Sequence, residues 1–334
     1  MYDIVSKVKD EEWNEFLEKA PNSNIFHTPE WKRIVENTFD YKPIYMFLKD
    51  KEGVLRGILP LFYINKRLTG KRICSVPFSH ICGALGEDTY KMALYKTLFL
   101  KYNELSADIA EIRQDERTFG FHTEHKFSTY VLNVDANLKS SLSKSMRRYL
   151  NKSLAFNDIV RAVDKSAIND IYELNCLNKK KNRVIAPPKK FFKNMVRYLG
   201  DNVHFHLIMN KGSSIGGAVS IDVHKNRLNY YIGCTDPSYY NKYPSYSYLW
   251  DMARLCLEKG TKELDLGPSS PDPENSLTKF KIRWGGKEEK MLYSYFPDVP
   301  KYEAKASLSH KLIGSMPHPM YKLYSKYVFS STIH

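Results

Sequence analysis

The spacing of apolar residues in the first third of the chain predicts helices alternating with short strands. Trp13 and Leu17 recur at helical spacing after Asp10, and Thr28-Pro29 provides the N-cap and first residue of a second amphipathic helix. Apolar runs bounded by turn residues predict a helix at 89–101 and strands at 43–48, 54–64, 73–78, 107–112 and 129–134. This part is therefore expected to be a mixed α/β unit.

The rest of the chain shows a similar mixture of elements. A helix with a cationic face, which carries Lys144, Arg147 and Arg148, is predicted over 138–154 and leads into the second half. Further helices are predicted at 169–181, 189–199 and 245–259, and strands at 159–163, 203–209, 215–223, 227–233 and 263–266.

Two hairpin patterns resemble each other across the two halves. Residues 44–64 and 203–223 both read as an apolar strand, a polar turn with glycine and a second apolar strand, and two predicted helices precede each. Chance similarity of two hairpins is the alternative, but the matching order of flanking elements favours a duplicated unit. We therefore expect domains at 1–137 and 138–300, with a tail at 301–334 that packs on the N-terminal domain.

The stretch from Glu263 to Lys287 has the pattern of a site that handles anions. An apolar strand ends at Asp265-Leu266-Gly267, a polar loop follows, and cations then alternate with aromatic residues before Gly285-Gly286. Lys281 could stabilise a developing oxyanion while Phe280 and Trp284 exclude water. The alternative is a solvated basic turn with two core aromatics.

Composition places the chain among globular proteins with a strong basic excess. Of the 334 residues, 43% are hydrophobic and 26% charged, and the formal net charge is +14. Such an excess attracts polyanions, which include nucleic acid, a phosphorylated substrate and an anionic membrane surface, although basic surfaces also serve solubility.

Other features point to a cytoplasmic protein without a metal site. No apolar run approaches the roughly 20 residues that span a bilayer, and the N-terminus lacks the pattern of a signal peptide. The five cysteines show no CxxC pairing or zinc spacing, so we expect reduced, mostly buried thiols. The histidines do not cluster with acids at metal spacing either, and His204 and His206, on one strand face, are expected to be structural.

Several segments together carry a resemblance to a known family. They include Phe26 to Trp31, Gly57 to Leu61, Ser75 to Phe78, Tyr230-Tyr231-Ile232-Gly233, Asp265-Leu266-Gly267, and Lys279-Phe280-Lys281 with Trp284-Gly285-Gly286. In their order and spacing, the chain resembles the Fem-type (FemABX-like) acyltransferases, which carry two tandem GNAT-like units. The resemblance implies an α/β (α+β) fold with a mixed sheet flanked by helices in each unit.

The resemblance also implies a function and site residues. Fem-type proteins transfer an amino or acyl group onto an amine or hydroxyl of a cell-envelope precursor, and the Phe-Lys pair at the transfer site matches Phe280-Lys281. Their phosphate-binding cations match Lys32 or Arg33, and Lys181 or Arg183. The substrate-contacting tyrosine matches Tyr231. Arg147 could add a bidentate phosphate contact, although a solvated helix face is the alternative.

The identity of the acyl donor depends on two further observations. The long antiparallel helical arm of some Fem-type members is absent, which leaves the aminoacyl-tRNA donor in question. However, the segment that would cradle the pyrophosphate of acyl-CoA, Asp236 to Ser245, has no glycine, and Pro244 removes one N–H donor. Its tyrosines could stack on the single-stranded end of tRNA, or simply pack the loop. We favour aminoacyl-tRNA as donor and expect no cofactor.

The predicted mechanism is direct attack of an acceptor amine on an activated acyl group. Lys281, expected at the mouth of a cleft between the two units, would stabilise the tetrahedral oxyanion or the leaving hydroxyl. Asp236 and Asp265 are candidates to accept the proton, although Asp265 is better suited to capping the strand-end loop.

Three alternatives remain open from the sequence. One is an acyl-CoA-dependent N-acyltransferase acting on an envelope sugar or peptide. Another is a protein that binds a nucleotide-linked precursor without transfer. The basic aromatic segment from Tyr321 to Tyr327 could also dock on the inner face of the membrane, in place of packing on the protein. The oligomeric state is not indicated.

Overall fold

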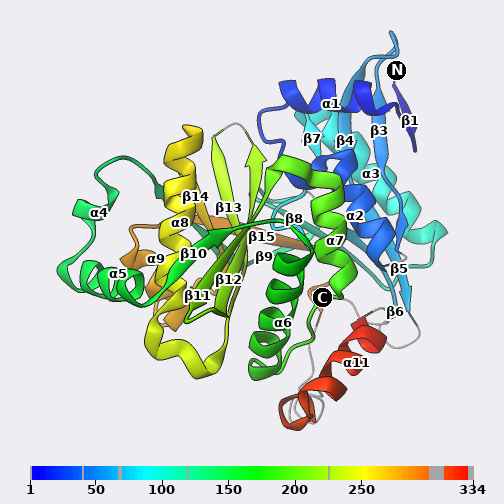
Figure 1. Ribbon diagram of the computed structural model, residues 1–334. Helices are drawn as coiled ribbons and strands as arrows, with labels where there is room; N and C mark the ends of the chain where they lie inside the picture. The colour runs from blue at the N-terminus through cyan, green and yellow to red at the C-terminus, as the bar shows by residue number, and fades with distance from the viewer. Residues whose placement is uncertain are drawn as a thin grey trace. The chain divides into compact units, whose positions relative to one another are not determined.

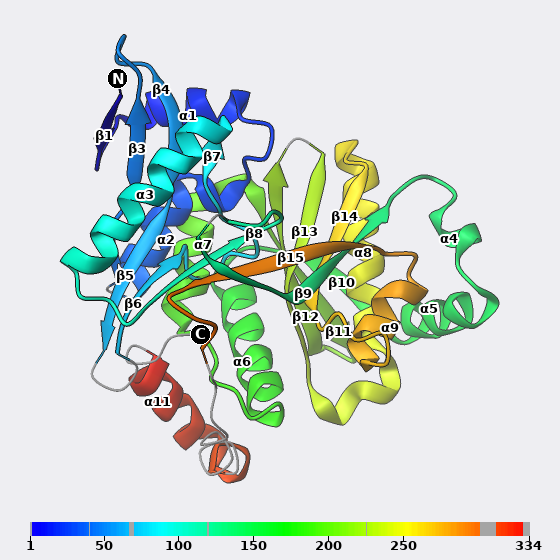
Figure 2. The same cartoon turned by 180° about the vertical axis from the view of Figure 1, so that it is seen from behind.

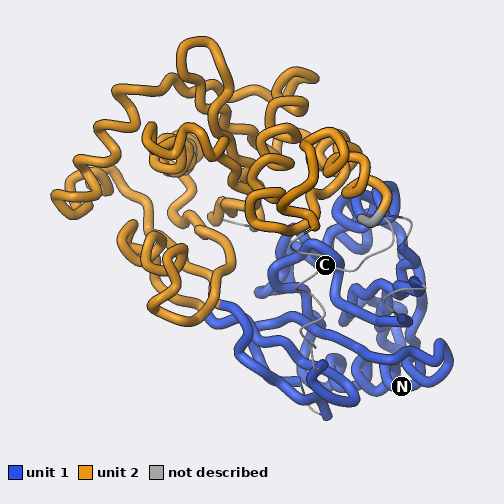
Figure 3. Tube along the Cα trace, turned by 90° about the horizontal axis from the view of Figure 1, so that it is seen from below, with its two compact units in different colours: residues 1–127, 290–302, 330–334 blue, residues 128–289, 303–329 orange. Residues whose placement is uncertain are grey.

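The chain forms two units of mixed α/β structure, which Figure 3 shows in different colours. The computed structural model describes residues 2–39, 41–66, 70–118, 120–224, 226–300 and 312–329. Unit 1 comprises residues 1–127, 290–302 and 330–334, and unit 2 comprises 128–289 and 303–329. The predicted boundary at 137/138 therefore lies after the observed one, and the segment from Lys290 to Tyr302 returns to unit 1.

Unit 1 contains strands of two sheets together with helices (Figure 2). Its helical elements are α1 (Asp10–Lys19), η1 (Ile25–His27), α2 (Pro29–Phe39) and α3 (Asp88–Glu104). The first sheet has the order β1 (Asp3–Val5), β3 (Met46–Lys49), β4 (Leu55–Leu59) and β7 (Leu85–Gly86). The second has the order β15 (Lys287–Phe296), β8 (Ile109–Gln114), β6 (Gly70–Ser75), β5 (Leu61–Lys66) and β2 (Lys42–Pro43).

The predicted strand at 54–64 is two strands in the structure. Pro60 separates β4 from β5, and it has no N–H with which to continue a ladder. As a result β4 pairs with β3 and β7, whereas β5 pairs with β6 and β2. The apolar run in the sequence was continuous, so periodicity alone did not reveal this division.

Unit 2 is built on one mixed sheet. Its order is β10 (Asp158–Arg161), β11 (Val203–Asn210), β12 (Ser213–His224), β13 (Arg227–Thr235), β14 (Glu263–Ser269) and β9 (His122–Asn133). Its helical elements are α4 (Leu138–Ser141), α5 (Lys144–Phe156), α6 (Lys165–Lys181), α7 (Lys189–Leu199), η2 (Gly200–Asn202), η3 (Pro237–Lys242), α8 (Pro244–Lys259), α9 (Ser276–Arg283) and α11 (His318–Phe329).

Helices cover both faces of this sheet (Figure 1). Side chains of neighbouring strand residues point to opposite faces, and a Cβ placed on Gly216 would meet Pro244 of α8, whereas one on Gly217 would meet Ile171 of α6. On the α8 side, Leu228 and Leu264 pack with Leu249 and Met252 in the main core. The glycine pair thus lets both helices approach β12 closely.

The order of elements supports the predicted duplication. Unit 1 has the antiparallel hairpin β3–β4 followed by the parallel pair β6 and β8, with α3 between them in sequence. Unit 2 has the hairpin β11–β12 followed by the parallel pair β13 and β14, with α8 between them.

Two local predictions differ from the structure. The helix predicted over 138–154 is divided into α4 and α5, because Leu142 is extended and the Ser143 hydroxyl caps α5 by accepting from the Met146 N–H. The tail was predicted to pack on the N-terminal domain, whereas its described helix, α11, belongs to unit 2 and packs on α6. The Tyr321 hydroxyl there donates to the Val184 carbonyl at 2.8 Å.

No helix in the part of the chain that the structure describes is long and apolar enough to cross a membrane.

Candidate functional site

The parallel strands β13 and β14 pair only at one end, and the candidate site lies where they separate. The paired positions are Arg227 with Glu263, Leu228 with Leu264, and Asn229 with Asp265. Beyond Asp265, β14 continues beside β9, where Pro268 lies opposite Thr129. Two strands that diverge after three residues leave their facing backbone and side chains available to a ligand.

A pocket of about 170 Å³ lies beside this divergence, and all its lining residues come from unit 2. Tyr230, Leu266, Phe280 and Lys281 are among them, together with Ser245, Tyr248, Leu249 and Leu277. The wall is largely apolar and aromatic, with one ammonium and a few hydroxyls. This composition is typical of a small-molecule site, in which a few polar groups orient an apolar ligand.

Lys281 is the central polar group of the pocket. Its side chain is buried, with 3% of the residue exposed, and its Nζ donates to the carbonyl oxygens of Gly267 at 2.6 Å and Pro268 at 2.9 Å. An ammonium has three N–H donors, so one is left for a ligand. Burial lowers the pKa of Lys281 to about 8, although the nearby charge of Asp265 acts in the opposite direction.

The segment around Lys281 is a helix, whereas the sequence pattern suggested a loop. Asn275 caps α9 by accepting from the backbone N–H groups of Leu277 and Thr278. The Thr278 hydroxyl donates to the Ser270 carbonyl at 2.7 Å, which ties the first turn of α9 to the end of β14. The lysine is therefore held on a regular element, which fixes its position more firmly than a loop would.

Asp265 has the capping role that the sequence indicated. Its Oδ1 accepts from the Gly267 N–H at 2.8 Å and from the Thr129 hydroxyl. It thereby fixes the conformation of Gly267, whose φ is +75°, and with it a carbonyl that holds Lys281.

Two tyrosines form the other polar part of the pocket. The hydroxyls of Tyr230 and Tyr248 lie 3.1 Å apart, and burial raises the pKa of Tyr230 to about 12, so both phenols keep their protons at neutral pH. The Tyr230 side chain covers Gly233, where any Cβ would overlap the phenol.

A second pocket, of about 330 Å³, adjoins the first and shares Ser245 and Tyr248 with it. It lies at the N-terminal end of α8, which begins with Tyr243 in the left-handed region (φ +56°) followed by Pro244. The helix start thus lies at Pro244, in the segment that the sequence analysis compared with an anion cradle, and Pro244 offers no N–H there.

Of the predicted catalytic residues, the structure brings Phe280 and Lys281 together and places Asp236 elsewhere. Asp236 is the N-cap of η3, where Oδ1 accepts from the Ser238 N–H at 2.9 Å. It lines neither of these two pockets. Asp236 is therefore a capping residue, and capping explains why an aspartate precedes Pro237 at the start of η3.

The predicted phosphate-binding cations are spread over several elements. In unit 1, Lys32 pairs with Glu36 at 2.8 Å and Arg33 pairs with Asp10. In unit 2, Arg147 Nη1 donates to the Ser140 carbonyl at 2.5 Å, and the Lys181 ammonium lies 3.8 Å from the ring centre of Tyr240. Arg183 is exposed just beyond α6, with φ +59°.

The remaining predicted substrate residues, Tyr231 and Trp284, do not line the Lys281 pocket. Tyr231 lies against Phe191 of α7, with ring centres 6.4 Å apart, while Trp284 is buried in the core and contacts Phe280. Tyr230, which sequence reasoning passed over, is the tyrosine in the pocket. Strand alternation could have identified Tyr230. It shares its strand face with Leu228, a core residue, whereas Tyr231 points to the other face.

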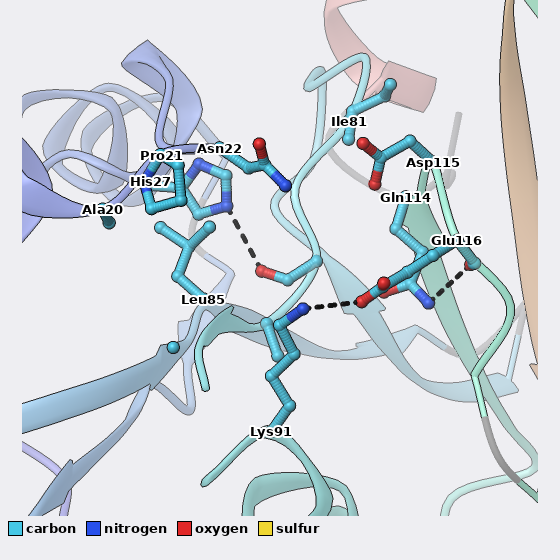
Figure 4. A pocket seen from close by; sticks show the side chains of 13 residues that line it. Ala20, Pro21, Asn22, His27, Ile81, Leu85, Lys91, Gln114, Asp115 and Glu116 are labelled. Atoms are coloured by element: carbon cyan, nitrogen blue, oxygen red, sulfur yellow. Dashed lines mark hydrogen bonds and ion pairs between the residues drawn. The ribbon is translucent and has the colours of Figure 1, made fainter. Parts of the chain in front are cut away.

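Unit 1 has a pocket of its own, which Figure 4 shows from close by. There the Lys91 ammonium meets the Glu116 carboxylate at 2.9 Å, and His27 Nε2 lies 3.2 Å from the Gly83 carbonyl oxygen. Asp115 adds a second acid. The predicted site residues are not among those that line it.

Comparisons with known proteins concern the fold of the chain and the class of its second half. The Acetyltransferase (GNAT) domain family matches residues 139–281, a range that ends at Lys281. The crystal structure of FemX superposes with a TM-score of 0.67 at 13% identity, covering 97% of this chain and 100% of that one. The structure of L-PGS from Bacillus licheniformis gives a TM-score of 0.56 at 9% identity, covering 92% and 97%.

A tandem GNAT protein from the clavulanic acid biosynthesis pathway also gives a TM-score of 0.56, at 10% identity, covering 88% of this chain and 98% of that one. A sequence search of curated proteins found no match. The predicted tandem GNAT-like fold and the resemblance to Fem-type proteins in fold are confirmed. The family match confirms the prediction of an acyltransferase domain.

Proposed function

We propose that this protein transfers an aminoacyl group from aminoacyl-tRNA to an amine of a cell-envelope peptide or glycan precursor. The observation that carries the proposal is the Lys281 ammonium, which is buried, anchored to two backbone carbonyls and placed in the wall of an apolar pocket between diverging parallel strands. A fixed cation with one N–H to spare is suited to a carbonyl oxygen on which negative charge develops.

The chemistry follows from that placement. The acceptor amine attacks the carbonyl carbon of the aminoacyl ester, and the new C–N bond forms as the carbonyl oxygen becomes an oxyanion beside Lys281. The C–O bond to the ribose then breaks, and the proton lost by the amine goes to the departing 2′- or 3′-hydroxyl. Lys281 stabilises the oxyanion without a covalent intermediate, and Asp236 has no part in the step because it caps η3 outside the pocket.

An RNA donor is supported by a row of aromatic rings beside the pocket. Tyr149, Tyr246 and Phe280 are partly exposed and contact one another in succession, with ring centres 5.7 and 5.3 Å apart, and Phe280 is backed by the buried Trp284. The Arg148 guanidinium lies 5.2 Å from the ring centre of Tyr149. Aromatic rings with flanking cations are the usual surface for unpaired nucleotides, and the net charge of +14 favours a polyanion.

Acyl-CoA is the second candidate donor, and the match to an acetyltransferase domain favours it. Against it stands the start of α8, where Pro244 takes the place of an N–H donor. In either case the acceptor is proposed to be an envelope precursor that carries phosphates, which a basic protein attracts.

The test offers both donors in parallel. Labelled aminoacyl-tRNA and labelled acetyl-CoA are each incubated with the protein and an extract of cell-wall precursors. We expect label to move from the RNA ester in the wild type and not in Lys281→Met, with precursor binding retained. Lys279→Met is the matched control, since Lys279 lies on the same helix but pairs with Glu274 at 2.6 Å. Transfer from the thioester alone would reverse the choice of donor, and binding without any transfer would indicate a non-catalytic precursor binder.

Contact with the inner face of the membrane is proposed for α11. Tyr321 is buried against α6, whereas Met320, Leu323 and Tyr327 are 59%, 70% and 79% exposed. Their spacing of three and four residues forms an apolar stripe on one side of the helix, beside the exposed Lys326. An apolar stripe flanked by a cation fits the surface of an anionic bilayer.

A further inference from the structure

Trp284 is the starting point, because its indole N–H is buried without an acceptor. The residue is 1% exposed, and its Nε1 has no hydrogen-bond partner among the residues that the structure describes. Buried donors in native proteins are nearly always paired, and an unpaired one is a cost to folding. A group that is unpaired in the free protein is therefore a candidate to be paired by a ligand.

Trp284 lines a pocket of about 240 Å³ that is separate from the Lys281 pocket and shares no residue with it. The pocket is formed by the end of β9, the segment around α4 and the turn between α9 and β15. Leu132, Leu138 and Leu142 form its apolar side. Gly285, with φ +95°, makes the turn that carries the chain past Trp284.

The charges at this pocket are of one sign. Arg283 and Lys287 line it, both are exposed, and no carboxylate lines it. Within the described part of the chain, neither cation has a side-chain ion pair, in contrast to Lys279 on the same helix. Two free cations, and an unpaired N–H on a residue that lines the same cavity, are groups of the kind that donate to a phosphate.

One aromatic contact connects the Trp284 pocket to the Lys281 pocket, which is the proposed transfer site. Phe280 lines the Lys281 pocket, and its ring lies 6.3 Å from that of Trp284, so a single aromatic contact connects the two cavities. A donor whose ester carbonyl is at Lys281 would bring the phosphodiester of its last nucleotides into this neighbourhood.

We propose that the Trp284 pocket binds a backbone phosphate at the single-stranded 3′ end of the donor RNA. The Trp284 N–H and the cations of Arg283 and Lys287 donate to the phosphate oxygens, while Phe280 and Tyr246 offer their rings to the adjoining bases. The assignment rests on the proposed function for the identity of the RNA, but the phosphate contacts are testable without catalysis.

The experiment follows the indole N–H directly by NMR on the full chain labelled with ¹⁵N. The chain has four tryptophans, so Trp284→Phe identifies the Trp284 resonance by its disappearance. An unacylated RNA hairpin ending in single-stranded CCA is titrated, and UDP is titrated separately as a small pyrophosphate. We expect the RNA to shift the Trp284 signal saturably. The double variant Arg283→Gln/Lys287→Gln should weaken RNA binding by roughly tenfold or more, with Lys279→Gln unchanged.

Two results would overturn the inference. One is a Trp284 signal that does not respond to RNA, or that responds only to UDP. The other is an RNA titration that the double variant leaves unchanged, which would show that Arg283 and Lys287 do not bind the phosphate. Transfer assays distinguish a failure of the phosphate site from a failure of the proposed function. If the wild type transfers from aminoacyl-tRNA but the Trp284 signal does not respond to RNA, the proposed phosphate site is wrong and the proposed function stands. If the Trp284 signal responds to RNA but no transfer from aminoacyl-tRNA occurs, the proposed function is wrong and the phosphate site stands.

Discussion

The Nδ1 atom of His206 lies 2.7 Å from Oδ2 of Asp251, and both side chains are buried in unit 2. On the other side of the ring, His206 Nε2 lies 2.8 Å from the Ser220 hydroxyl. The order Ser–His–Asp resembles a hydrolase triad, but Ser220 is fully buried. Asp251 is also held by Arg161 through two hydrogen bonds of 2.8 Å. The group therefore acts as a polar part of the core, as the sequence indicated for His206.

Replacing Asp251 by Ala should destabilise the fold by about 3–5 kcal/mol. The change leaves His206 Nδ1 without its partner and leaves Arg161 with only one of its two carboxylates, that of Glu258, and removing one partner of a buried ion pair costs more than the pair itself contributes. Urea unfolding followed by circular dichroism measures the loss. Asp222→Ala is a milder comparison, since Asp222 is more exposed and pairs with His204 at 3.1 Å. A loss below about 1 kcal/mol for Asp251→Ala would contradict this account.

The Asp251 carboxylate should also make the stability of the fold depend on pH in the acidic range. Burial acts to raise the pKa of Asp251, but hydrogen bonds from His206 and Arg161 outweigh it and lower the pKa to about 2, below the ordinary value of 3.8. Stability from this group is present above pH 4 and is lost as the pH falls from about 4 to about 2. Unfolding of the wild type against pH should show this loss, and in Asp251→Asn that part of the slope should be absent.

Lys281 predicts the pH dependence of transfer. With a pKa near 8, it carries its proton below pH 8 and loses it as the pH rises further. If the ammonium stabilises the oxyanion, the transfer rate should fall above about pH 8. Single-turnover rates between pH 6 and 10 measure it. A rate that rises through pH 8 would instead indicate that neutral Lys281 acts as a base.

Lys281→Met should lower the rate constant of transfer by about 10²–10³-fold, the usual effect of removing one oxyanion donor. Folding should be retained, because a methionine fills the space and needs no desolvation. An unfolding midpoint near that of the wild type, together with the lost rate, is the expected combination. Equal transfer by both proteins would remove Lys281 from the mechanism.

Gly233→Ala should disable the pocket by moving Tyr230. A Cβ at this position overlaps the Tyr230 phenol, which must then leave its place beside Tyr248. We expect transfer to fall at least tenfold, with a smaller change in Tyr230→Phe, which keeps the ring in place. Gly212→Ala, at a turn with open space around it, controls for the loss of a glycine: its φ of +78° makes the alanine cost some stability, but transfer should be unchanged. Normal activity in Gly233→Ala would show that the position of Tyr230 is unimportant.

The apolar stripe on α11 predicts association with anionic vesicles. Met320→Ser/Leu323→Ser should reduce the fraction of protein that sediments with phosphatidylglycerol-containing vesicles, since both side chains are exposed and contribute to no core. Leu257→Ser, an exposed apolar residue on α8, is the control. An unchanged pellet fraction would assign the stripe to another role.

Much of the fold could be predicted because local pattern determines it. The helix over 189–199 was predicted with the bounds that α7 has, and the Gly-containing hairpin β11–β12 was predicted from its alternation and turn. What escaped prediction depends on distant residues or on single backbone groups. Pro60 divides a continuous apolar run between two sheets, and Ser143 starts a new helix inside a helical pattern.

The candidate site shows the same limit. Phe280 and Lys281 follow from a short motif and lie together in the structure. Arg33, by contrast, pairs with Asp10, 23 positions earlier, which no local pattern reveals. The pocket itself exists because β13 and β14 separate, and strand separation is a property of the sheet that a single sequence does not display.

The tether of Lys281 to the carbonyls of Gly267 and Pro268 has an engineering consequence. Every residue type supplies a carbonyl, so the anchor makes no demand on the identity of the side chains in the stretch from Ser270 to Glu274. The side chains of that segment can therefore be exchanged while the ammonium keeps its place, as long as the Ser270 carbonyl still accepts from the Thr278 hydroxyl.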